Sequence, residues 1–175
     1  MQAATFVFRD IAERITEGAS AFSNMGVTYK GSSDDAALNA GIARFAADKA
    51  AAEALNDDGV AAGNIPVPVV SIHSFNDPQA AVETQYEYRE RAKAMGKDGL
   101  LVQAYTDENV HVGQSDAEMG ASILALAAWV DKKEKPSPQS IAASCEKLKA
   151  TLEGPCRWHP EYDPKPLSTR FARGQ

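Results

Sequence analysis

Two apolar runs with a helix-length segment between them constrain this chain more than any other feature. Residues 67–72 read VPVVSI and residues 100–105 read LLVQAY, as expected of strands that are covered by helices on both faces. Residues 78–95, between the two runs, read as a helix that Gly96 closes. A strand, a helix and a second strand form a βαβ unit, in which the strands are parallel and the crossover is almost always right-handed. The sequence therefore predicts an α/β fold built on this unit.

Two side chains that can carry chemistry follow these runs. Asp77 comes after the first run and His111 after the second. Functional groups in open parallel sheets gather beyond the carboxyl ends of the strands, so we expect these two side chains to meet there. Each also has a plainer interpretation, Asp77 as a turn or helix-cap residue and His111 as an ordinary loop histidine. We expect His73 to support the Asp77 loop by hydrogen bonding and His159 to be a packing residue.

The amino-terminal third reads as helical and contains no clear strand. A helix is expected over residues 3–17, and another is expected to begin at Ser33 as its N-cap, with acidic residues in its first turn. The second helix should bury one face, because apolar residues recur at helical spacing (Leu38, Ile42 and Phe45). A short helix is expected over residues 49–55. We interpret residues 1–64 as a helical segment.

The rest of the chain is predicted to divide into a core and a tail. Ser115 and Glu118 match a capping box, which opens an amphipathic helix and completes a core of residues 65–133. Residues 134–175 are rich in proline and contain one expected helix at 140–152, so we interpret them as a strap laid over the domain.

Only two strands are convincing in this sequence. A two-stranded parallel sheet with apolar faces cannot stand alone, because both of its edges present unpaired backbone groups. We expect neighbouring strands to come from an upstream part of a larger protein, from a second chain or from an exchanged copy of this one. The partners expected are therefore a missing amino-terminal half or a homo-oligomer.

Composition excludes several classes of partner. The 175 residues are 44% hydrophobic and 24% charged, with a net charge of −6 and no block of Lys or Arg, which argues against nucleic acid and anionic membranes. No window approaches the roughly 18 apolar residues of a membrane span. Arg9 and Asp10 fall where a signal peptide would need its apolar core, so no export signal is expected. The three histidines are too scattered to predict a metal site, and no glycine-rich phosphate loop predicts a cofactor.

Cys145 and Cys156 are the two cysteines of the chain. They are interpreted either as two thiols or as a disulfide that ties the 140–152 helix to the strap. We favour the disulfide, because a proline-rich tail with little core gains about 2–3 kcal/mol from such a link in the chain-entropy model. A disulfide would imply an oxidising compartment, periplasmic or secreted.

Four segments carry a resemblance to a known family. From about Asn24 to its carboxyl terminus, the chain resembles the carboxyl-terminal half of bacterial α/β-hydrolases of the esterase type. The segments are GSSDDAALNAGIARFAAD (31–48), IPVPVVSIHSFNDP (65–78), LLVQAYTDENVHVGQSDAE (100–118) and GPCRWHPEYDPKPLSTR (154–170). The resemblance implies a partial α/β-hydrolase fold, in which Asp77 is the acid and His111 the histidine of a Ser-His-Asp triad. It also implies that residues 1–64 are a lid-like segment, matching helices that commonly cover the active site.

The family's nucleophile lies on a Gly-x-Ser-x-Gly elbow between a strand and a helix, and this chain contains no such elbow. Ser20 lacks the second glycine, Ser33 has an expected capping role and Ser122 falls inside a predicted helix. Ser115 is explained by its capping box. The oxyanion-hole loop of the family is missing as well, which argues against catalysis by this chain alone.

Three functions remain open from the sequence. The first is the carboxyl-terminal portion of a serine ester hydrolase, acting on a small ester with a nucleophile from elsewhere. The second is a truncated hydrolase that folds but does not turn over. The third is an oligomeric binding protein that uses the two strand-end loops, with the amino-terminal helices as a lid. The sequence leaves the identity of the substrate open.

Overall fold

The computed structural model describes residues 9–170, which divide into two compact units. One unit is Ala62–Leu167, and the other combines the described residues before Ala62 with those after Leu167. Each unit is described by itself below. No helix among the described residues is long and apolar enough to cross a membrane.

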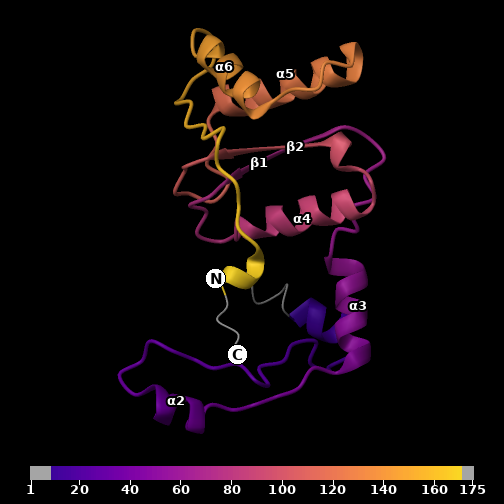
Figure 1. Ribbon diagram of the computed structural model, residues 1–175, viewed down its shortest axis with the longest axis vertical. Coiled ribbons are helices and arrows are strands. Elements are labelled where there is room, and N and C mark those ends of the chain that lie inside the picture. The colour runs from indigo at the N-terminus through magenta and orange to yellow at the C-terminus, as the bar shows by residue number, and fades with distance from the viewer. Residues whose placement is uncertain (1–8, 171–175) are drawn as a thin grey trace. The chain divides into compact units, whose positions relative to one another are not determined.

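The Ala62–Leu167 unit has three layers (Figure 1). Its middle layer is a parallel sheet of β1 (Val69–Ser74) and β2 (Leu101–Thr106). Helix α4 (Glu83–Ala94) covers one face of this sheet, and α5 (Asp116–Lys132) and α6 (Pro138–Leu148) cover the other. The predicted parallel strand–helix–strand order is confirmed, and the unit has mixed α/β structure.

Apolar side chains fill the space on both sides of the sheet. The larger core cluster joins β2 to α5 and α6 and contains Val102, Ala104, Ala117, Ala121, Trp129, Ile141 and Cys145. A smaller cluster on the other side contains Ile65, Ala92 and Leu101. Because successive side chains of a strand point to opposite faces, Leu101 and Val102 contribute to different clusters. Burial on both faces explains why the two strands read as continuous apolar runs.

Helix α4 begins later than the predicted start at residue 78. The side chain of Asp77 accepts hydrogen bonds from the backbone N–H groups of Gln79 and Ala80, at 2.8 and 2.9 Å. These bonds hold a turn directly after β1, and regular helix follows only from Glu83. The short 3₁₀ helix η2 (Asp98–Leu100) then leads into β2.

The capping box predicted for α5 is confirmed. The Ser115 hydroxyl accepts from the backbone N–H of Glu118, and the Glu118 carboxylate accepts from the backbone N–H of Ser115. The Ser115 hydroxyl also donates to the carbonyl of Pro155 at 2.6 Å. The start of α5 is therefore joined to the tail.

The tail crosses the end of β2 and is linked to α6. Thr106 and Trp158 form an antiparallel bridge, and His159 N–H donates to the carbonyl of Tyr105 at 2.8 Å. Cys145 of α6 and Cys156 of the tail form a disulfide, as predicted. These contacts hold residues 156–159 against the carboxyl end of β2.

The amino-terminal unit departs most from prediction. Its described helices before Ala62 are η1 (Ile11–Ile15), which is a π-helix, α2 (Asp35–Gly41) and α3 (Lys49–Gly59). The 3₁₀ helix η3 (Leu167–Arg170) begins at the last residue of the other unit and continues into this one. The expected helix at residues 3–17 lies partly outside the described residues. The expected helix at 49–55 is confirmed and extends four residues further.

Two predictions for α2 are wrong. Its N-cap is Asp34, which accepts from the N–H of Ala37, in place of Ser33. It ends at Gly41 without a buried residue, and Phe45 is 48% exposed. The early end of α2 has a long-range cause. The Asn24 side chain donates to the Ala43 carbonyl and accepts from the Phe45 N–H, which holds residues 43–45 outside the helix.

Candidate functional site

Asp77 and His111 meet at the carboxyl ends of the two parallel strands. Nδ1 of His111 lies 2.9 Å from Oδ2 and 3.1 Å from Oδ1 of Asp77, across a sequence separation of 34 residues. The Asp77 side chain is 8% exposed, whereas that of His111 is 39% exposed. The structure therefore brings together the two side chains that the strand order predicted to be neighbours.

The surroundings of Asp77 keep its carboxylate ionised. Burial acts to raise the pKa of this carboxyl group. The two backbone hydrogen bonds from its own turn and the bond with His111 outweigh burial and lower the pKa to about 2. An ionised carboxylate can only accept, so the proton of the contact belongs to Nδ1 of His111. The Nε2 atom of the neutral ring then carries the free lone pair.

A histidine fixed in this way can take a proton from a hydroxyl group at Nε2. Among residues 9–170, no hydroxyl group is hydrogen-bonded to this atom. The nearby Ser74 and Ser115 hydroxyls bond the backbone carbonyls of Glu108 and Pro155. The described residues thus contain a base with its orienting acid and no paired nucleophile.

The loop that carries His111 is tightly turned. One carboxylate oxygen of Glu108 accepts from the N–H groups of Asn109 and Val110, at 2.6 and 3.1 Å. Val112 has a φ of 55°, in the left-handed region that β-branched residues rarely adopt. A Cβ at Gly113 would lie 2.7 Å from Cγ of Glu108, so a larger residue there would require the Glu108 side chain to shift.

An arginine of the tail contacts this loop and the start of α5. The Arg157 guanidinium forms ion pairs with Glu108 and with the fully buried carboxylate of Glu118, and donates to the carbonyl of Gly113. Sequence reasoning assigned Glu118 only to the capping box and gave Arg157 no role. The one feature of the sequence that could have indicated a role for Arg157 is its position directly after Cys156, one of the two cysteines.

The structure contains a second acid–histidine contact. Nε2 of His159 lies 3.0 Å from Oδ2 of Asp107, and both side chains are more than 40% exposed. The His159 ring packs edge-on against Phe75, with ring centroids 5.0 Å apart. Nδ1 of His73 lies 2.7 Å from the carbonyl of Ser74. The Asp107–His159 pair is a natural comparison for the Asp77–His111 pair.

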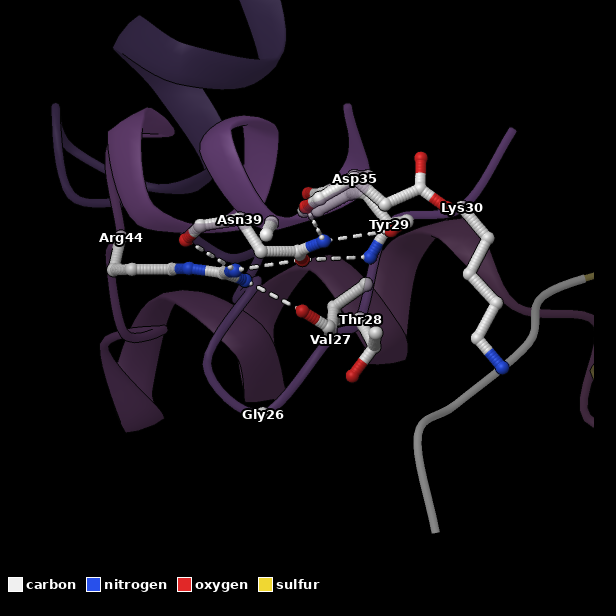
Figure 2. Close-up of a pocket in the computed structure, with 9 residues that line it drawn as sticks. Gly26, Val27, Thr28, Tyr29, Lys30, Asp35, Asn39 and Arg44 are labelled. Carbon is white, nitrogen blue, oxygen red and sulfur yellow. Dashed lines mark hydrogen bonds between the residues drawn. The ribbon is translucent and has the colours of Figure 1, made fainter. Parts of the chain in front are cut away.

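A cavity of about 470 Å³ lies in the amino-terminal unit (Figure 2). Arg44 donates to the carbonyl of Val27 at 2.7 Å and lies over the Tyr29 ring, 5.3 Å from its centroid. The Asn39 side chain bonds both the N–H and the carbonyl of Tyr29. These polar groups satisfy one another, so we interpret the wall of this cavity as structural.

No group of three His, Cys, Asp or Glu side chains in residues 9–170 is placed to hold a metal ion. Comparisons of the chain with protein-family models, with curated proteins and with solved structures found no match. The resemblance to α/β-hydrolases therefore stays a prediction, and the Asp77–His111 geometry carries the functional argument.

Proposed function

We propose that this chain supplies the acid and the histidine of the Ser-His-Asp triad of a serine ester hydrolase. The observation that carries the proposal is the contact of His111 Nδ1 with both oxygens of the buried Asp77 carboxylate, at 2.9 and 3.1 Å. Its position at adjacent strand ends also supports the proposal, because the acid and the histidine of an α/β-hydrolase triad follow strands in this chain order.

In the proposed reaction, His111 takes the proton of a serine hydroxyl at Nε2 as that oxygen attacks the ester carbonyl. Asp77 keeps the other ring proton on Nδ1 and stabilises the imidazolium that forms. His111 then donates the proton to the leaving alcohol, and water releases the acyl group by the same steps. The substrate class is a small carboxylic ester.

The nucleophile in this proposal comes from an upstream segment of a larger protein or from a partner chain. The sheet supports this idea, because β1 has one strand neighbour within the described part of the chain and its other edge can accept another strand. A strand paired there would extend the same row of carboxyl ends at which Asp77 and His111 lie. A serine after that strand would approach Nε2.

The alternative is a hydrolase portion that folds but does not turn over, or an oligomeric binding protein. The lack of a hydroxyl partner for Nε2 among the described residues favours this alternative. The two possibilities differ in whether an ester is cleaved.

Hydrolysis of a short-chain p-nitrophenyl ester tests the proposal. We expect Asp77→Asn and His111→Ala to lower kcat by roughly 10³-fold or more, as loss of a triad member does. Asp107→Asn and His159→Ala remove the second acid–histidine pair and serve as matched controls, with kcat expected within about twofold of the parent. Equal losses in both sets of variants, or activity that survives without His111, would contradict the proposal.

A chain that folds and cleaves no ester by itself fits both the alternative and the proposal, because the proposal takes its nucleophile from elsewhere. The tautomer of His111 is then measured by ¹⁵N NMR at neutral pH, which needs no nucleophile. A proton on Nδ1 preserves the proposed base for a serine supplied in trans, and a proton on Nε2 rules it out.

A further inference from the structure

A cluster of three charged side chains lies beside the loop that carries His111. The backbone N–H and Nε of Arg157 donate to one carboxylate oxygen of Glu118, at 2.7 and 3.2 Å, and Nη2 donates to the other at 2.9 Å. The Glu118 side chain is 0% exposed, and that of Arg157 is 24% exposed. A buried carboxylate with this many donors fixes the position and plane of the guanidinium.

The same guanidinium reaches both ends of the loop. Its Nη1 pairs with one carboxylate oxygen of Glu108, whose other oxygen holds the N–H groups of the next two residues. Its Nη2 donates to the carbonyl of Gly113 at 2.9 Å. Residues 108–113 are therefore attached at each end to one rigid group, and His111 lies between the two attachments.

The backbone of Arg157 is itself held in place. The neighbouring Cys156 is bonded to Cys145 of α6, and the carbonyl of Arg157 accepts from the N–H of Asp107 at 3.3 Å. Arg157 is thus held in place by α6, through the disulfide, and by the residue that follows β2.

The loop needs such an anchor for a physical reason. Val112, next to His111, has a φ of 55°, and strained residues persist only where their surroundings hold them. We propose that Arg157 is a positioning residue that keeps His111 against Asp77, by tying both ends of the 108–113 loop to the buried carboxylate of Glu118. The catalytic role of this positioning rests on the proposed function, whereas the contacts of Arg157 are present in the structure whatever the function is.

Two substitutions test the role of Arg157. Arg157→Lys keeps the charge and loses the planar fork that bonds Glu118, Glu108 and Gly113 together. Glu108→Gln keeps an oxygen for the N–H groups of the loop and leaves the Arg157–Glu118 bonds intact, so it remains informative if Arg157→Lys fails to fold. Arg89→Lys is the matched control, because Arg89 pairs with the exposed side chain of Asp163 in the same unit.

The readout is the solvent exchange rate of the His111 Nδ1 proton, measured by NMR on the full chain. We expect this rate to rise about tenfold in Arg157→Lys and in Glu108→Gln, as for the loss of one charge-assisted hydrogen bond, and to stay unchanged in Arg89→Lys. A change of stability alone, without faster exchange in a folded variant, would overturn the inference. An unchanged rate in Glu108→Gln would overturn it as well.

This experiment separates the inference from the proposed function. Proton exchange at Nδ1 requires no nucleophile and no ester. Faster exchange in both variants of a chain whose ester cleavage survives His111→Ala supports the inference and counts against the function. Ester cleavage that depends on His111 with unchanged exchange in both variants supports the function and overturns the inference.

Discussion

The carboxylate of Asp77 accepts hydrogen bonds from two N–H groups of its own turn and from a histidine 34 positions away. Asp77 is therefore both a turn residue, as its plainer interpretation says, and the partner of His111. The turn bonds converge on Oδ1, and His111 contacts both oxygens. The turn bonds fix the carboxylate independently of the histidine, as the positioning of an orienting acid requires.

The first prediction concerns the response of Asp77 to acid. Its pKa is about 2 in the folded chain, against an ordinary value near 3.8 that we take for the unfolded chain. A lowered folded pKa contributes stability that is complete above pH 3.8 and is lost as the pH falls through 2. Asp77→Asn removes this contribution, so its deficit in unfolding free energy should be larger at pH 5 than at pH 2. Urea unfolding at both pH values measures the deficit, and an equal deficit would contradict the assignment.

At the scale of elements, the start of α5 depends on a close approach of the tail. Gly154 has a φ of 100°, and a Cβ there would lie 2.4 Å from Cβ of Ser115. Two residues later, Cys156 forms the bridge to α6. Ser115 of the capping box and Gly154 of the tail are therefore packed tightly against each other, and we call this contact the Ser115–Gly154 corner.

The second prediction is that Gly154→Ala destabilises the fold by about 2 kcal/mol or more, through both left-handed backbone strain and overlap with Ser115. Gly99→Ala is the matched control, because a Cβ at Gly99 meets no atom within 4 Å. The control is expected to change the free energy of unfolding by about 0.5 kcal/mol or less. Chemical denaturation compares the two, and equal effects would show that the corner tolerates a side chain.

At the scale of the whole molecule, much of the Ala62–Leu167 unit is held by contacts between segments far apart in sequence. Among residues 9–170 the sheet has two strands, and its core is shared with α5 and α6. The disulfide closes the link from α6 to the tail that carries Arg157. Loss of this link should weaken the unit as a whole.

The third prediction is that replacing Cys145 and Cys156 together by serine lowers the free energy of unfolding by about 2–3 kcal/mol, as the chain-entropy model gives for a loop this short. A thiol reductant should lower the Tm of the parent chain and leave the double variant unchanged. Thermal unfolding with and without reductant makes the comparison. An equal Tm for the oxidised parent and the double variant would show that the bridge adds no stability.

The sequence alone determined features whose causes are local or follow from chain order. The capping box of Ser115 and Glu118 lies within one helical turn, and apolar runs on either side of a helix lead to parallel strands. Parallel strands place their carboxyl ends at one edge, which is why Asp77 and His111 could be expected to meet. The two cysteines allow one pairing, whereas the contact that brings Cys145 and Cys156 together was decided by the tertiary structure.

Only the tertiary structure decided the features that depend on distant partners. Asn24 bonds a segment about 20 positions away and so ends α2 before the predicted apolar face is complete. The spacing of apolar residues along the helix gives no sign of this contact. Arg157 reaches Glu118 across 39 positions and Gly113 across 44, so its link to His111 exists only after the tail has folded over β2. Local patterns set which elements form, whereas long-range polar contacts set where helices end and what holds a loop in place.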